Sequence, residues 1–415
     1  MKKKLPLTSF ENAAYSIEQY KNVFFHDELN DKSISSFRNP GLHKIKIFDG
    51  IYLDIFTSGL TQKANETQFF LVVFGGAVSD RLGKKAPFFS GKGIARELEM
   101  NFLAISDPCL ALNDKLALGW YLGFPPVGDL STKIANILDE ICHRFSLKAC
   151  LVGGSGGGFA AINVGSKMNS APKCLVWGPQ TSVSKYSATS VAEFINSTLQ
   201  LEKEVNSDSD FYQILDEAGV HHDITSANID NFSQLIYLQN VSDSHIAKHL
   251  APFVCGRLGD EIVQNVHMIG DEDKLICLCD WGKGHIPPPR DTTLKILSVM
   301  CRLNDTTSTF CNALTDILSS NRVVIKNLPL DSFQIEAEVS GNVVHGKATI
   351  KECDHLYLKY SYYLIINGTR ENVRPYSYNS SFTFDLNKSG LKSVSIIGFA
   401  LDILGNKLRK KISIA

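Results

Sequence analysis

The sequence predicts an α/β domain with a mostly parallel sheet and helices on both faces, followed by an antiparallel β-sandwich. Three observations carry this prediction. Apolar runs of strand length alternate with helical patterns up to about residue 320. A glycine-rich turn follows one of these strands at residues 153–158. From about residue 322 onwards, apolar and polar residues alternate with period two.

The strands of the first domain are short and apolar. Phe69–Phe74 is a continuous apolar run, which is typical of a strand buried on both faces. Phe102–Ile105 and Ala149–Val152 are further strands, and Asp129–Arg144 has the periodicity of an amphipathic helix. Because strands and helices alternate, the strands are expected to lie parallel.

The domain boundaries follow from changes in this pattern. We expect an N-terminal extension over residues 1–40, the α/β domain over 41–320, and the β-sandwich over 322–415. The stretch from about 182 to 232 is more polar and is interpreted as a cap inserted into the sheet. Asn367-Gly368 is a strong hairpin-turn signal within the last part, whose length suits an immunoglobulin- or fibronectin-like sandwich.

Composition narrows the class of protein. A net charge of −1 argues against a dedicated nucleic-acid binder. The sequence contains no run of about 18 apolar residues, so no membrane span is expected. The lysines at the N-terminus are not followed by the apolar segment of a signal peptide, so secretion is not expected. Ten cysteines, most of them in apolar runs, suggest a reducing compartment and a cytoplasmic protein. Cys277-Leu-Cys279 lacks a second pair, so no metal site is expected.

The glycine-rich turn Gly153-Gly154-Ser155-Gly156-Gly157 has the G-x-S-x-G pattern between a strand and a helix. In such a tight turn, small neighbours allow the serine Oγ to project above the sheet as a nucleophile. A structural turn and a nucleotide-binding loop are the alternatives. A Walker loop would need a lysine that is absent, and a dinucleotide site would need a carboxylate after the next strand, which ends in Pro179-Gln180-Thr181.

A nucleophilic serine needs a base and an orienting acid from later strand ends. His285 directly follows the last apolar strand, between glycine and proline residues. Asp243 follows the strand Leu235–Gln239 and lies 243 − 155 = 88 residues after the serine. Asp271 and Asp280 are alternative acids, although too few residues separate them from His285 for a helix and a strand. The alternative role of Asp243 is an N-cap of the next helix.

Oxyanion donors are expected at two places. The first is the amide of Gly156, directly after the serine, and the second lies in the loop Gly75-Gly76-Ala77 after a buried strand. Asp107, at another strand end, either lines the pocket or caps a turn.

With these elements in order, residues 40–320 resemble the α/β-hydrolase superfamily. The resemblance implies a catalytic triad of Ser155, Asp243 and His285, with oxyanion donors at Gly76 or Ala77 and at Gly156. The stretches Ser106-Asp-Pro, Leu118–Gly123 and Asp280–Pro288 also look like hydrolase-like proteins of bacterial surface-glycan and accessory-secretion loci. The small residues around Ser155 depart from the larger ones common in lipases, which leaves the acyl substrate open.

The expected function is therefore a serine esterase or acyltransferase, with O-acetyl groups of a bacterial surface polysaccharide as one candidate substrate. A catalytically inactive scaffold or partner-binding protein in a glycan or secretion assembly is one alternative, and a peptidase or thioesterase is another. No cofactor is expected, apart from an acyl donor such as acetyl-CoA if the reaction is a transfer. The expected partners are a small-molecule or glycan ester, and a glycan or protein bound by the C-terminal domain.

Overall fold

The computed structural model divides the chain into two compact units, residues 1–323 and 324–415, and each is described by itself. Parts of the predicted extension and cap, and the segment between the two units, lie outside the described residues. The described residues are 14–61, 68–81, 83–125, 127–199, 208–255, 257–263, 266–301, 307–319, 333–350, 358–377, 379–386, 392–401 and 407–414.

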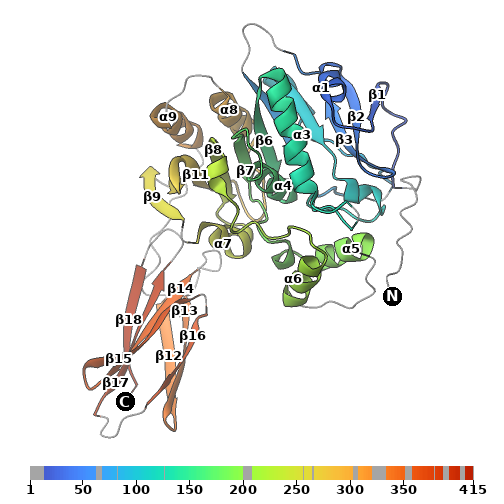
Figure 1. Cartoon of the computed structure of the whole chain (residues 1–415). Coiled ribbons are helices and arrows are strands. Elements are labelled where there is room, and N and C mark those ends of the chain that lie inside the picture. Colours follow the sequence, from blue (N-terminus) through green and yellow to red (C-terminus); the bar gives the residue numbers. More distant parts are fainter. Residues whose placement is uncertain are drawn as a thin grey trace. The chain divides into compact units, whose positions relative to one another are not determined.

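The first unit is built on an eleven-stranded sheet with the order β1-β2-β3-β5-β4-β6-β7-β8-β11-β10-β9 (Figure 1). The strands from β5 to β11 in this order are parallel, whereas β3 is antiparallel to both of its neighbours. The strands are β1 (Val23–His26), β2 (Gly41–Phe48), β3 (Ile51–Thr57), β4 (Phe69–Phe74), β5 (Asn101–Ile105), β6 (Lys148–Gly154), β7 (Lys173–Trp177), β8 (Gln234–Asn240), β9 (Leu258–Val263), β10 (Val266–Ile269) and β11 (Asp271–Cys279).

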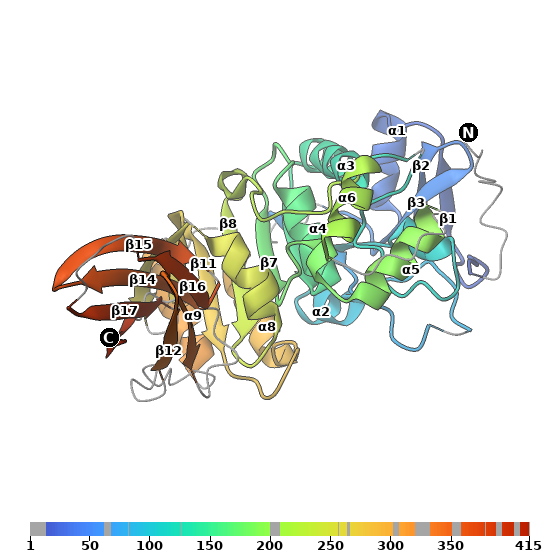
Figure 2. The same ribbon diagram turned by 90° about the horizontal axis from the view of Figure 1, so that it is seen from below.

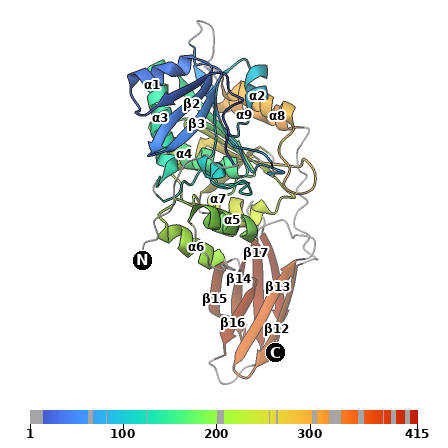
Figure 3. The same cartoon turned by 90° about the vertical axis from the view of Figure 1, so that its right-hand side faces the viewer.

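Helices cover both faces of this sheet. Figure 3 shows α1 (Asp31–Ser35) and α3 (Leu130–Phe145) on one side, and α2 (Lys92–Glu97), α8 (Arg290–Met300) and α9 (Thr307–Leu318) on the other. Helix α4 (Gly156–Gly165) packs beside α3 and against β4, β6 and β7. None of the helices in the described part of the chain is long and apolar enough to cross a membrane.

The connection between β7 and β8 carries α5 (Ala188–Thr198) and α6 (Asp208–Glu217), which lie beyond one end of the strands (Figures 1 and 3). Figure 2 shows the same unit from below, with β7 and β8 between α4 and α8. The shorter helices are η1 (Ser36–Arg38), η2 (Pro108–Ala111), η3 (Val183–Lys185), η4 (Ile229–Asn231), η5 (Ile246–Leu250) and α7 (Ala251–Val254).

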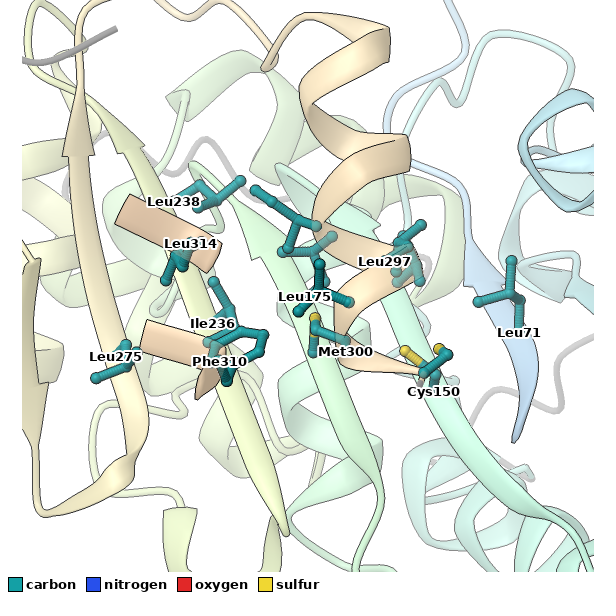
Figure 4. Packing of buried hydrophobic residues seen from close by; sticks show 14 of the residues in the cluster. Leu71, Cys150, Leu175, Ile236, Leu238, Leu275, Leu297, Met300, Phe310 and Leu314 are labelled. Carbon is teal, nitrogen blue, oxygen red and sulfur yellow. The ribbon is translucent and has the colours of Figure 1, made fainter. Parts of the chain in front are cut away.

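One core cluster fills the space between the sheet and the layer of α2, α8 and α9. Successive strand residues point to opposite faces, so every second residue of the central strands enters this cluster. Leu71, Cys150 and Leu175 come from three such strands and meet Leu297 and Met300 of α8 (Figure 4). The parallel sheet is therefore buried on this face, as its apolar runs predict.

Both edges of the sheet extend beyond the predicted elements. Residues 1–40 are expected to form an extension, yet β1 pairs in parallel with β2 and Phe37 is fully buried. At the other edge, β10 and β9 add an antiparallel hairpin beside β11. These segments are short and carry mixed polarity, so periodicity alone does not reveal them.

The second unit is a sandwich of two antiparallel sheets with one shared apolar core. Asn367 and Gly368 both have positive φ in the turn between β14 and β15, as a type I′ hairpin requires. The predicted fold class is confirmed in both parts of the chain. The strands are β12 (Phe333–Ser340), β13 (Val343–Ile350) and β16 (Ser381–Asp385) in one sheet, and β15 (Thr369–Ser377), β14 (Lys359–Ile366), β17 (Val394–Leu401) and β18 (Lys407–Ser413) in the other.

Because the two cores are separate, core mutations should destabilise one unit at a time. Leu175→Ala and Ile396→Ala each remove a fully buried side chain, one from each core. Each is expected to lower the unfolding free energy of its own unit by about 2–5 kcal/mol. Hydrogen exchange read by mass spectrometry would report this as lost protection in β6 and β7 for the first variant, and in β14 and β17 for the second. Equal loss in both units for either variant would contradict two independent cores.

Candidate active site

Ser155 occupies a strained turn between β6 and α4. Its backbone has φ 53° and ψ −123°, a conformation that costs a non-glycine residue on the order of 1–3 kcal/mol. The Ser155 amide donates to the carbonyl of Trp177 at 3.0 Å. Gly156 is the first residue of α4, where helix amides have no intrahelical acceptor. The serine side chain is half-buried.

The glycines beside Ser155 permit close approach of neighbouring strand ends. A Cβ on Gly154 would lie 2.0 Å from the Trp177 indole nitrogen. A Cβ on Gly157 would lie 2.4 Å from the carbonyl oxygen of Phe74, a backbone atom that cannot rotate away. Small residues are therefore required here by packing.

Asp243 and His285 lie in contact at neighbouring strand ends. Asp243 follows β8 and His285 follows β11, and these two strands are paired in parallel. His285 Nδ1 and Asp243 Oδ2 are 2.6 Å apart; the carboxylate side chain is 1% exposed, whereas the imidazole is 40% exposed. Burial acts to raise the pKa of Asp243, but the hydrogen bond from His285 and the proximity of His245 together hold it below the usual value. The ionised carboxylate therefore accepts the Nδ1 proton, which leaves His285 Nε2 as the basic nitrogen.

Hydrogen bonds from the β8 end hold the loop that carries His285. Asn240 Nδ2 donates to the carbonyl oxygens of Gly282 and Gly284 at 2.8 and 2.6 Å. Ser242 Oγ donates to Gly282 O at 2.6 Å and accepts from Gly284 N at 2.9 Å. The segment that carries Asp243 thus also holds the loop of His285 in place. Sequence reasoning missed Asn240 and Ser242, although both lie within three residues of Asp243.

The loop after β4 brings Gly76 close to Ser155. Tyr121 Oη accepts from Gly75 N at 2.8 Å, which occupies that amide. The amides of Gly76 and Ala77 have no hydrogen-bond partner within the described part of the chain. A Cβ built on Gly76 would lie 3.9 Å from Ser155 Cβ. Gly76 therefore adjoins Ser155, as the sequence predicts for a residue in this loop.

A cavity of about 250 Å³ adjoins the same loop. Asp107 lines it and also caps a turn, since Oδ1 accepts from Cys109 N and Oδ2 from Tyr121 N. Burial raises the pKa of this carboxyl group, and the two backbone hydrogen bonds oppose the rise. Asp107 therefore both lines the cavity and caps a turn, the two roles that were considered for it as alternatives. The other lining residues are Gly75, Gly76, Ala77, Val78, Phe88, Phe89, Ser90, Leu110, Leu118, Gly119 and Tyr121.

The hydroxyl group of Ser155 bonds to Gln180 instead of His285. Gln180 Nε2 lies 2.9 Å from Ser155 Oγ, and no hydrogen bond joins Ser155 to His285 among the described residues. The imidazole nevertheless borders the turn. A Cβ on Gly178 would lie 3.0 Å from His285 Cε1, and Gly178 directly follows Trp177, which binds the Ser155 amide.

The alternative acids lie elsewhere. Asp271 begins β11, at the strand end opposite the one that leads to His285. Asp280 Oδ1 accepts from Gly282 N at 3.1 Å and is exposed. Asp280 does not make the contact with the imidazole that Asp243 makes among the described residues.

His245 lies next to this pair and brings a third potential ligand. One ligand atom from each of Asp243, His245 and His285 lies within 4.8 Å of the others. However, His245 Nδ1 lies 3.0 Å from the carbonyl oxygen of Gly178 and therefore carries a proton. The 2.6 Å separation between His285 and Asp243 is also that of a hydrogen bond, whereas two ligands of one ion stand further apart. The geometry thus fits hydrogen bonding better than metal ligation.

The close packing around Ser155 predicts that alanine at Gly157 costs more stability than alanine at Gly156. Gly157→Ala would push a Cβ into the Phe74 carbonyl and should destabilise the first unit by about 1–3 kcal/mol. In Gly156→Ala, the nearest atom to the new Cβ is the end of the Leu118 side chain at 2.5 Å, with Gln180 Oε1 at 3.3 Å. This variant should cost less because both neighbours are side-chain ends and not backbone. Thermal melts followed by near-ultraviolet circular dichroism would measure both. Equal melting temperatures for the two variants would contradict the packing argument.

No family model matches the sequence, and no curated protein matches it either. Several solved structures resemble the chain. The Gap123 glycosylation-associated protein complex of Streptococcus agalactiae aligns with 64% of this chain at 14% identity and a TM-score of 0.37. The capsule O-acetyltransferase of Neisseria meningitidis serogroup A aligns with 58% at 14% identity and a TM-score of 0.37. The acylaminoacyl peptidase of Pyrococcus horikoshii aligns with 65% at 12% identity and a TM-score of 0.41.

The aligned regions span 45%, 89% and 43% of those three chains, respectively. Likenesses at this level carry no argument about activity. The strand order, the antiparallel strand β3 between β2 and β5, and the strained serine between β6 and α4 decide the fold. On these observations, the first unit has the α/β-hydrolase fold.

Proposed function

We propose that this protein is a serine esterase or acyltransferase that works through an acyl-enzyme on Ser155. The observation that carries the proposal is the buried, ionised Asp243 bound to His285 beside a serine with positive φ. A serine hydroxyl needs a base to become nucleophilic, and an imidazole needs an acceptor on Nδ1 to act as that base at Nε2.

In the proposed reaction, Ser155 Oγ attacks the ester carbonyl carbon while its proton passes to His285 Nε2. Asp243 stabilises the imidazolium ion and holds the tautomer. When the tetrahedral intermediate collapses, the carbon–oxygen bond to the alcohol breaks and the imidazolium protonates the leaving oxygen. A water molecule or a second hydroxyl group then attacks the acyl-enzyme, with His285 taking its proton. The bond between the acyl carbon and Ser155 Oγ breaks, and the imidazolium returns the proton to Oγ. Water gives hydrolysis, and a sugar hydroxyl gives transfer.

The charge on the carbonyl oxygen requires donors that are already in place. The amides of Gly76 and Ala77 have no partner within the described part of the chain, and that of Gly156 begins a helix. Donors of this kind act without reorganisation as the charge develops, which makes them effective. We assign the oxyanion site to Gly156 together with Gly76 or Ala77.

For the substrate, we propose an O-acetyl ester on a bacterial surface polysaccharide, with acetyl-CoA as a donor if the reaction is a transfer. The cavity beside the oxyanion loop, of about 250 Å³, suits a small group better than a long acyl chain. We further propose that the second unit binds the glycan or a protein partner. No disulfide joins the cysteines of the described ranges, in keeping with a cytoplasmic location.

A fluorophosphonate probe tests the nucleophile directly. The wild-type protein is expected to be labelled on Ser155, and Ser155→Ala should abolish labelling because it removes the proposed nucleophile. Peptide mass spectrometry would locate the adduct. An unlabelled wild-type protein would favour the scaffold alternative, and turnover of peptides but not p-nitrophenyl acetate would favour a peptidase.

Asp280 provides a matched control for substitution of Asp243, the proposed acid of the triad. Asp243→Asn should lower kcat on p-nitrophenyl acetate by about 10⁴-fold, because the amide favours the wrong imidazole tautomer. Asp280→Asn should retain most of the activity, since within the described ranges the Asp280 carboxylate accepts a hydrogen bond from Gly282 N and makes no contact with His285. Similar activity for Asp243→Asn and the wild type would overturn the assignment of the acid.

A further inference from the structure

A hydrogen-bond chain of fixed direction ends on the hydroxyl group of Ser155. Trp120 Nε1 donates to Gln180 Oε1 at 2.6 Å, and Gln180 Nε2 donates to Ser155 Oγ at 2.9 Å. An indole nitrogen can only donate, so the amide oxygen of Gln180 must face Trp120. The amide nitrogen must therefore face Ser155, and Ser155 Oγ must accept.

We propose that Gln180 is a positioning residue for the nucleophile, an inference that rests on the proposed function of Ser155. Because Oγ accepts from the amide, the single hydroxyl proton of Ser155 is left to be donated elsewhere, and the proposed function assigns that proton to His285 Nε2. The same amide stabilises negative charge as it grows on Oγ during attack. Gln180 thus keeps the serine oriented as a proton donor towards its base.

Burial makes the hydrogen bonds from Trp120 to Gln180 and from Gln180 to Ser155 rigid. Trp120 and Gln180 are both fully buried. The indole packs edge-on against Tyr186 and Phe194, with ring centroids 5.9 and 5.8 Å away. Neither side chain can exchange its partner for water, so each hydrogen bond is strong and its loss is not compensated.

The backbone that presents Trp120 is itself strained. Trp120 and Tyr121 are consecutive bulky residues with φ of 53° and 56°, a conformation that such residues rarely adopt. Persistent strain of this kind points to a functional constraint. This turn sends Trp120 towards Gln180 and Ser155, and Tyr121 Oη to the Gly75 amide at 2.8 Å. One strained turn therefore braces both the nucleophile and the oxyanion loop.

Near-isosteric substitutions separate positioning from packing. Gln180→Glu keeps an oxygen for Trp120 but replaces the donor on Ser155 with an acceptor, which would capture the hydroxyl proton. Gln180→Met keeps the volume and removes both hydrogen bonds. We expect Gln180→Glu to slow fluorophosphonate labelling and kcat on p-nitrophenyl acetate by about 100-fold or more, with KM nearly unchanged. Gln180→Met should lose less, because it adds no competing acceptor.

Trp120→Phe serves as a second, milder variant. It keeps a ring in the aromatic cluster and removes only the N–H group that orients the Gln180 amide, so labelling should slow by about tenfold. Melting curves would establish that each variant is folded. If Gln180→Glu does not fold, Trp120→Phe decides the question.

The outcomes distinguish this inference from the proposed function. A wild-type protein that is not labelled refutes the nucleophile and the positioning role together. A labelled wild type with folded Gln180 and Trp120 variants that react at the wild-type rate refutes the positioning role alone. A fall in kcat with constant KM supports it, whereas a rise in KM at constant kcat would indicate a pocket residue and overturn it.

Discussion

The close approach of three strand ends at Ser155 is the constraint on which the site depends. Gly157 lies against the Phe74 carbonyl of β4, and Gly154 lies against the Trp177 ring of β7. Both contacts leave no space for a Cβ atom. The serine amide is bonded to Trp177 O within this packing, so the positive φ of Ser155 is maintained by the surrounding sheet. The loop after β4, in which we propose the oxyanion donors, is placed by the same contacts.

Much of this arrangement could be predicted from strand ends. Parallel strands bring their carboxyl ends to one edge of a sheet, so a polar residue directly after an apolar run has a definable place. Asp243 and His285 satisfy that condition after β8 and β11, and the structure brings them together. The glycine-rich turn marks Ser155 because few other turns need so many small residues in succession. Their roles in catalysis stay a prediction.

Other parts of the site have no local sequence signal. Gln180 follows a strand end, but the orientation of its amide depends on Trp120. That residue lies 60 positions earlier in the sequence and reaches Gln180 through tertiary packing. Asn240 likewise gains its role from carbonyl groups in a distant loop. The edge strand β1 was missed for a related reason, since its residues are only partly buried and show no clear period.

The attachment of the His285 loop to the β8 end has a consequence for local opening. Asn240 and Ser242 hold Gly282 and Gly284 from the segment that also carries Asp243. His285, the proposed base, is thus held to the segment of Asp243 more directly than to Ser155. A fluctuation that releases this edge would remove histidine and carboxylate as one cooperative unit. The turn that carries Ser155 lies on different strands and would remain formed. Partial unfolding of this kind would abolish the proposed activity while Ser155 kept its conformation.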